Sequence, residues 1–209
     1  MEKFPAATYT IFIINLAVYL LTFNKPYIIS EFGLALENLQ TKPYTLITHM
    51  FLHTGLIHLI INMLIFLALG AVVESKIGSL NLAFFYFFSG FFALPFLFLI
   101  QFLTNQFVLA VGSSACIFGL IFLAGAIAGW EEIPVLLVPL LNIVALPFIF
   151  FTLKNFKVPL FVGVLFYILL DIFLLWYYFP NNISEFAHFG GIIGGIIGFL
   201  VLPKKKNLR

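Results

Sequence analysis

Apolar residues dominate the chain in long runs, and clusters of polar residues separate these runs. A helix needs roughly 17–25 apolar residues to cross a bilayer, and six runs are about that long. They are residues 8–23, 50–73, 80–103, 113–130, 158–179 and 187–203. The pattern predicts an all-α membrane protein, a bundle of six transmembrane helices that forms one domain over residues 1–209.

The connections between these runs differ in character. Residues 24–47 hold several charged residues, and we expect a structured loop at the membrane interface. Residues 131–157 are apolar, but three prolines interrupt them and two lysines lie near their end. The first run resembles a signal peptide, yet no A-x-A-like cleavage site follows it, so we expect it to remain as a membrane helix.

Composition and charge support this topology. Of the residues, 63% are hydrophobic and 9% charged, whereas soluble domains average about 45–50% and about 25%. With six spans and a cytoplasmic N-terminus, the basic residues divide eight to two in favour of the inside, as the positive-inside rule requires. The inner set is Lys3, Lys76, Lys154, Lys157, Lys204, Lys205, Lys206 and Arg209, and the outer set is Lys25 and Lys42.

A seventh span over residues 133–153 would move Lys154 and Lys157 to the outer side. We therefore interpret residues 131–157 as a re-entrant or interfacial segment on the cytoplasmic side. Both termini are expected in the cytoplasm, with the chain in the cell (plasma) membrane.

Four polar residues are expected to share one layer near the outer face. Ser114 opens the fourth span and His188 the sixth, while His58 and Asn62 lie four residues apart on one face of the second. Counting about 1.5 Å per residue from the charged residues at the inner ends places the serine and both histidines roughly 24–26 Å above that boundary. Because polar groups at this depth are costly, each is a functional candidate.

This set of residues suits nucleophilic catalysis. A serine hydroxyl needs a base within hydrogen-bond reach and donors for an oxyanion. Ser114 is the candidate nucleophile and His188 the candidate base, with the Ser114 N–H, His58 and Asn62 as oxyanion donors. Asp171, the single aspartate, is expected to be a buried hydrogen-bonded residue of the bundle, because a Ser–His dyad is the simpler arrangement.

Close contact between the fourth and sixth spans is a requirement of this arrangement. Gly191 and Gly195 on the sixth span, with Gly119 on the fourth, allow two helix backbones to approach. Taken alone, the glycines fit ordinary helix packing in any multi-pass protein equally well.

Three motifs resemble those of the rhomboid family of intramembrane serine proteases. Gly112-Ser113-Ser114-Ala115 resembles its G-x-S-x motif, His58 and Asn62 its H-x-x-x-N pair, and Ala187-His188-Phe189-Gly190-Gly191…Gly195 its A-H-x-x-G-x-x-x-G span. The resemblance covers roughly residues 45–202. It implies a rhomboid-like bundle in which Ser114 attacks and His188 relays the proton, with Phe118 stacked on the base, and it implies transmembrane-helix substrates. The first loop lacks the Trp-Arg pair that is common in the family.

Other functions remain open from the sequence. The nearest is a catalytically silent rhomboid-like protein that binds membrane clients, and a small transporter is the next. A zinc protease would need H-E-x-x-H and an aspartyl protease two aspartates, and the chain has neither. We expect no metal, cofactor or nucleic-acid partner; the substrate and the oligomeric state are not fixed by the sequence.

Overall fold

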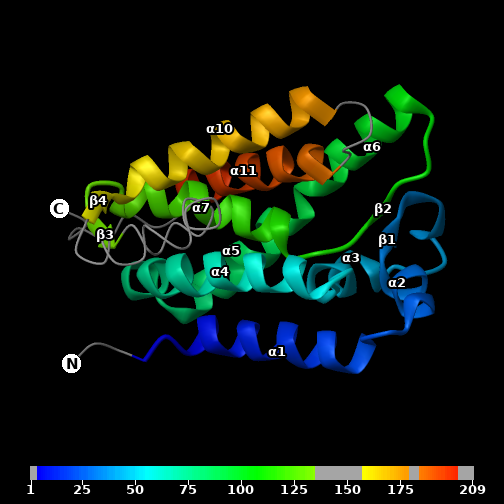
Figure 1. Ribbon diagram of the computed structural model, residues 1–209, viewed down its shortest axis with the longest axis horizontal. Coiled ribbons are helices and arrows are strands. Elements are labelled where there is room, and N and C mark those ends of the chain that lie inside the picture. Colours follow the sequence, from blue (N-terminus) through cyan, green and yellow to red (C-terminus); the bar gives the residue numbers. More distant parts are fainter. Residues whose placement is uncertain (1–3, 135–156, 179–183, 202–209) are drawn as a thin grey trace, which may run out of the picture.

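The computed structural model describes residues 4–134, 157–178 and 184–201, which are mostly helical (Figure 1). The main helices are α1 (Ala6–Thr22), α4 (Leu56–Ile77), α5 (Ser79–Phe91), α6 (Ala93–Thr104), α7 (Ser114–Ala128), α10 (Leu160–Tyr178) and α11 (Ser184–Val201). The short elements are α2 (Pro26–Phe32), α3 (Thr45–Thr48), two 3-10 turns (Leu36–Asn38 and His49–Phe51) and the strands β1 (Leu34–Ala35), β2 (Leu109–Ala110), β3 (Glu132–Pro134) and β4 (Lys157–Pro159).

The helices coincide with the six apolar runs of the sequence. Three stretches are long and apolar enough to cross a membrane, and three shorter apolar helices accompany them. The long ones are Leu56–Ile77, Ser79–Thr104 and Leu160–Tyr177, and the shorter ones are Ala6–Thr22, Ser114–Ala128 and Phe186–Val201. The helix of the second predicted span, α4, begins at Leu56 rather than at residue 50, because Gly55 is fully extended (φ −166°, ψ 164°). The helical, multi-pass membrane character predicted from the sequence is confirmed.

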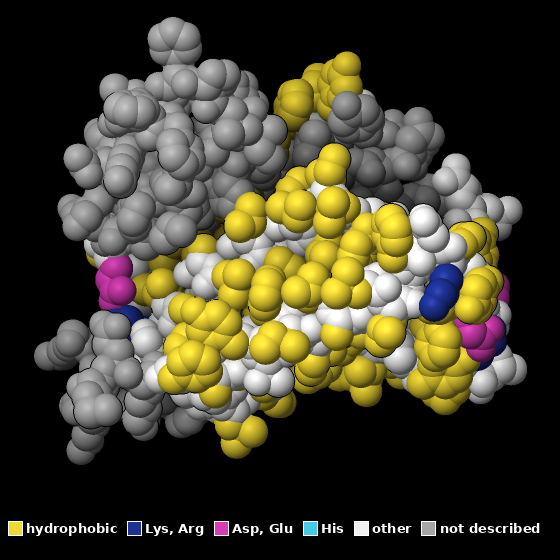
Figure 2. Space-filling model, turned by 60° about the horizontal axis from the view of Figure 1, so that its bottom comes forward, with side chains coloured by type: hydrophobic (Ala, Val, Ile, Leu, Met, Phe, Trp, Pro, Cys, Tyr) yellow, Lys and Arg dark blue, Asp and Glu magenta, His cyan; other side chains and the backbone are white. Residues whose placement is uncertain are grey.

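The outer surface of the bundle is apolar. Figure 2 shows hydrophobic side chains across the middle of one face and charged side chains only near its ends. Large exposed apolar side chains come from every main helix except α7, among them Leu20, Leu64, Phe84, Phe102, Leu169, Trp176 and Leu200. Such a surface is suited to lipid rather than water.

Helix α7 lies at the centre, in contact with α4, α5, α10 and α11. Its buried residues cover most of its circumference, as expected of a helix that is hydrophobic on all sides. Its length of 15 residues gives about 22 Å. Because α7 is enclosed by these four helices, they determine where its first residue, Ser114, lies.

Glycines allow α11 to approach α7 at backbone distance. A Cβ on Gly191 would collide with the carbonyl oxygen of Ala115, and one on Gly195 would lie 3.0 Å from the Cα of Gly119. On the other side, a Cβ on Gly194 would lie 2.8 Å from the Cα of Ser89 in α5. Since backbone atoms cannot rotate aside, these positions require glycine for the observed spacing.

A buried carboxylate joins three helices at the opposite end of the bundle from the first loop. Glu74 of α4 accepts hydrogen bonds from the backbone N–H groups of Ala7 (2.9 Å) and Thr8 (2.8 Å), and from the hydroxyls of Thr8 (2.7 Å) and Ser79 (2.5 Å). The N–H groups at the start of α1 have no partner within that helix, and Glu74 supplies one. This carboxylate has a structural role.

The connection after α7 leaves and returns at the same end of the bundle. Strands β3 and β4 pair antiparallel, and the N–H groups of Leu160 and Phe161 donate to the carbonyl oxygens of Glu131 and Gly129. The end of α7 and the start of α10 are thereby adjacent. Residues 135–156, to which the re-entrant interpretation applies, lie outside the described residues.

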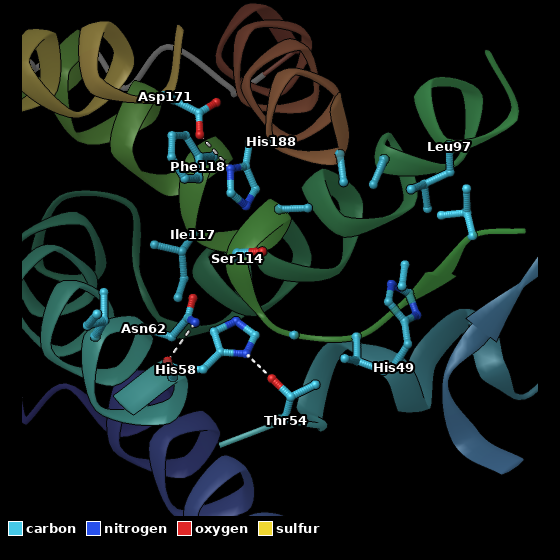
Figure 3. A pocket seen from close by; sticks show the side chains of 18 of the residues that line it. His49, Thr54, His58, Asn62, Leu97, Ser114, Ile117, Phe118, Asp171 and His188 are labelled. Atoms are coloured by element: carbon cyan, nitrogen blue, oxygen red, sulfur yellow. Dashed lines mark hydrogen bonds and ion pairs between the residues drawn. The ribbon is translucent and has the colours of Figure 1, made fainter. Parts of the chain in front are cut away.

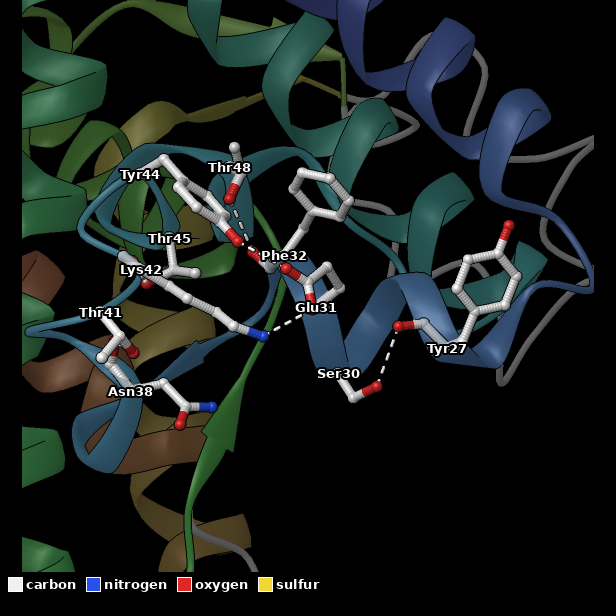
Figure 4. Close-up of polar contacts among 10 residues, drawn as sticks. All are labelled: Tyr27, Ser30, Glu31, Phe32, Asn38, Thr41, Lys42, Tyr44, Thr45 and Thr48. Atoms are coloured by element: carbon white, nitrogen blue, oxygen red, sulfur yellow. Dashed lines mark hydrogen bonds and ion pairs between the residues drawn. The ribbon is translucent and has the colours of Figure 1, made fainter.

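The first loop is structured, as expected, and is held by polar contacts (Figure 4). Glu31 accepts hydrogen bonds from Lys42 (2.5 Å) and from the Tyr44 hydroxyl (2.7 Å), and the Gln101 amide of α6 donates to Glu37 (2.5 Å). The same loop supplies β1, which pairs antiparallel with β2 just before Ser114. These contacts anchor the loop, which lacks the Trp-Arg pair common in the family that the sequence resembles.

The glycine contact between α7 and α11 can be tested by a Gly191→Ala substitution. Forcing a methyl group against the Ala115 backbone should lower the free energy of unfolding by about 1–3 kcal/mol. Gly55→Ala is the matched control, because its backbone is extended and a Cβ there meets nothing within 4 Å. Thermal unfolding in one detergent would compare the variants, and equal stability of both with wild type would contradict the close approach.

The contacts of Glu31 predict a pH-dependent contribution of the first loop. Hydrogen bonds from Lys42 and then Tyr44 hold the pKa of Glu31 below its ordinary value of 4.5. A carboxyl group with a depressed folded-state pKa stabilises the fold above its unfolded pKa, and this contribution is lost as the pH falls through the folded-state value. The Tm difference between wild type and Glu31→Gln should therefore be largest near neutral pH, and it should disappear as the pH falls below 4.5 and through the lower folded-state pKa of Glu31. A difference independent of pH would contradict the charge interaction.

Candidate active site

Ser114 is the first residue of α7, and the turn before it is held from two sides. Gly112 has φ +121°, a conformation that favours glycine, and its N–H donates to the His49 carbonyl oxygen (2.8 Å). Ser113 is fully buried, with its hydroxyl 3.4 Å from Nε2 of His53. These contacts fix the start of α7, where the backbone N–H groups have no partner within the helix.

His58 and Asn62 reach the same region from α4 (Figure 3). Nδ1 of His58 lies 3.4 Å from the Thr54 hydroxyl, and Nε2 lies beside Gly112, 3.1 Å from where a Cβ would be. Asn62 donates one N–H to the His58 carbonyl oxygen (2.9 Å). Its amide retains a second N–H that can serve a ligand.

His188 projects from the first half of α11 and is held by its face and by one edge. Its ring stacks on Phe118 of α7 with 4.2 Å between centroids and 10° between planes. Its Nδ1 lies 2.7 Å from Oδ1 of Asp171 in α10. Figure 3 shows the second ring nitrogen on the side of Ser114. The imidazole is therefore oriented by two helices other than its own.

One pocket of about 720 Å³ brings these side chains together. Ser114, His188, His58 and Asn62 all line it, together with Asp171 and Gly112. Most of the remaining wall is apolar and comes from β2 and its flanks and from α6 and α7, including Leu97, Val108, Leu109 and Ile117. Gly119, Gly191 and Gly195 lie in the packed interior between helices instead.

The described polar side chains of the pocket are not linked by one continuous series of hydrogen bonds. Among the described residues, no hydrogen bond joins the Ser114 hydroxyl to His188. Catalytic hydrogen bonds are often long in a free enzyme and shorten when a substrate binds. No group of three or more metal-ligating side chains occurs within residues 4–134, 157–178 and 184–201.

Two polar neighbours of the histidines were not assigned to the site from the sequence. Thr54 contacts His58, and Asp171 contacts His188. One sequence feature could have indicated Asp171, since a carboxylate within a membrane helix is a functional candidate in itself. No sequence feature indicated Thr54, because threonine is common at helix starts.

The fold and the pocket together define a class: a multi-pass helical membrane protein with a serine, an asparagine and three histidines in one pocket. A family model described as the Rhomboid domain matches residues 40–204. The chain belongs to the rhomboid family. It is similar to RHOMBOID-like protein 6, mitochondrial, of Arabidopsis thaliana, with 30% identity over 169 residues. That match covers 79% of this chain and 46% of the relative, so the chain spans about half of the relative's length.

Proposed function

We propose that the chain is an intramembrane serine endopeptidase with Ser114 as nucleophile and His188 as general base. The observation that carries the proposal is the pocket that Ser114 shares with His188, His58 and Asn62 inside an apolar bundle. Family membership supports it, although the family also contains members without catalytic activity.

The reaction follows from the roles of the two residues. Ser114 Oγ attacks the carbonyl carbon of the scissile peptide bond, and its proton passes to Nε2 of His188. The C–N bond then breaks and His188 returns the proton to the leaving amine. Water hydrolyses the acyl-enzyme in a second cycle, with His188 again taking and returning a proton.

The developing oxyanion is bound by the Ser114 N–H, the ring of His58 and the second N–H of Asn62. Donors that are positioned in advance are most effective where water is excluded. The apolar wall of the pocket supplies that environment around the polar group.

The substrates are proposed to be transmembrane helices with a locally unwound segment that enters the pocket. A peptide bond in an intact helix is closed to attack because its carbonyl is hydrogen-bonded and packed. The apolar lining suits a hydrophobic segment, and the lipid bilayer delivers it.

The topology is proposed to comprise six spans in one domain, with both termini cytoplasmic. The paired strands β3 and β4 support it, because they bring the connection back to the end that it left. In Figure 1 the start of α1 and the end of α11 lie at that same end. The proposed location is the cell membrane, whereas the printed name of the Arabidopsis relative assigns that protein to mitochondria.

Proteolysis should depend on both members of the proposed dyad. Purified chain in liposomes would be incubated with a model transmembrane substrate, with and without a chelator. Wild type should cleave it regardless of the chelator, and Ser114→Ala and His188→Ala should each lose about 10³-fold or more of kcat. Ser75→Ala is the matched control, since this serine of α4 lies outside the pocket, where its hydroxyl donates to the Val72 carbonyl oxygen, and it should retain most of the activity.

Other outcomes would contradict the proposed dyad or favour another function. Cleavage that survives in Ser114→Ala would contradict the nucleophile, and cleavage lost with the chelator would favour a metalloprotease. A folded wild type that binds several transmembrane segments and cuts none would favour a catalytically silent client-binding protein.

The proposed topology can be tested by single-cysteine labelling. Cys116 is the single cysteine of the chain and is buried, so Cys116→Ala gives a clean background. In intact cells, a membrane-impermeant maleimide should label Gln40→Cys in the first loop but reach Lys205→Cys only after lysis. Labelling of both residues in intact cells would contradict a cytoplasmic C-terminus.

A further inference from the structure

Asp171 has a contact pattern that differs from that of a structural carboxylate. It is 4% exposed, and its Oδ1 lies 2.7 Å from Nδ1 of His188. Its Oδ2 has no hydrogen-bond partner among the described residues. Glu74, by contrast, accepts four hydrogen bonds from Ala7, Thr8 and Ser79.

This difference bears on what Asp171 does. A carboxylate that joined helices for stability alone would be expected to satisfy both oxygens, because an unpaired buried oxygen is costly. Within the described part of the chain, the side chain of Asp171 instead has one hydrogen-bond partner, the Nδ1 atom of His188 in the pocket.

The chemistry of imidazole makes this contact consequential. Neutral histidine carries its proton on one nitrogen and an acceptor lone pair on the other. An ionised carboxylate can only accept, so beside Nδ1 it selects the tautomer with the proton on Nδ1. Nε2 then presents its lone pair to the Ser114 side of the pocket, as a general base must.

We propose that Asp171 is a positioning residue that holds His188 in the tautomer and orientation needed to accept the Ser114 proton. The proposal rests on the proposed protease function and extends its dyad to Ser114, His188 and Asp171. Phe118 fixes the plane of the ring by stacking, and Asp171 fixes which edge of the ring carries the proton.

Asparagine and alanine variants separate this role from packing. In Asp171→Asn the new side chain fills the same volume, but its amide can donate to Nδ1 of His188 and so select the opposite tautomer. In Asp171→Ala the partner is removed and a cavity is left. The proposal therefore predicts that Asp171→Asn loses about 10²-fold of kcat with KM nearly unchanged, and loses at least as much as Asp171→Ala. A packing role predicts the reverse order.

The experiment combines kinetics on a model transmembrane substrate in liposomes with ¹⁵N NMR of histidine rings in the same samples. The His188 signals would be assigned by their loss in His188→Gln. Wild type should show a protonated Nδ1 and an unprotonated Nε2, and Asp171→Asn should shift the proton to Nε2. Glu74→Gln is the matched control: it removes a buried carboxylate far from the pocket and should lower Tm while leaving kcat and the His188 tautomer unchanged.

The two readouts judge the two proposals separately. Full kcat in Asp171→Asn, a larger loss in Asp171→Ala than in Asp171→Asn, or a wild-type His188 with its proton on Nε2 would overturn the positioning role while leaving the protease proposal standing. If wild type cleaves nothing, the protease proposal fails. The tautomer of wild type and Asp171→Asn then decides by itself whether Asp171 positions His188.

Discussion

The close approach of α7 and α11 is the constraint on which the rest of the molecule depends. Ser114 precedes the residue whose carbonyl meets Gly191, and His188 lies one turn before that glycine. The distance between the serine and the imidazole is thus set by a backbone contact that tolerates no Cβ. In lipid, where apolar surface gains little by leaving its solvent, such tight packing of small residues is a main source of helix association. The same contact therefore serves both the stability of the bundle and the geometry of the pocket.

Different contacts hold the helices together at the two ends of the bundle. At one end Glu74 joins α4 to the starts of α1 and α5, and the paired β3 and β4 hold α7 next to α10. At the other end the first loop anchors the turn that leads into α7, through β1 on β2 and through the His49 carbonyl on Gly112. Buried polar groups without intrahelical partners are costly in an apolar medium, and these contacts satisfy several of them. The first-loop end also forms part of the pocket, because His49, β2 and Gly112 line it.

The sequence predicted the helices well, since apolar runs of membrane length leave few alternatives. Because the rise per residue is constant within a helix, the sequence also led us to expect Ser114, His58 and His188 near one another, and all three line one pocket. It could not predict the contact of Asp171 with His188. Asp171 is the twelfth residue of α10 and His188 the fifth of α11, and counting cannot supply the tilt and offset that bring them to 2.7 Å. Nor could it predict the pairing of β1 with β2, which joins two loops far apart in sequence through two residues each.

Two of the three pocket histidines, His58 and His188, illustrate how the partner of one ring nitrogen bears on the role proposed for the other nitrogen. His58 has a hydroxyl beside Nδ1, and a hydroxyl can donate to that nitrogen. Its Nε2 then carries the proton and can stabilise an oxyanion. His188 has a carboxylate beside Nδ1, which accepts, so its Nε2 is left to take a proton. A carboxylate can only accept and therefore selects one tautomer, whereas a hydroxyl donates or accepts as water does and leaves both tautomers open to His58. In the proposed mechanism, the partner of Nδ1 thus fixes His188 as the base and permits His58 to act as a donor.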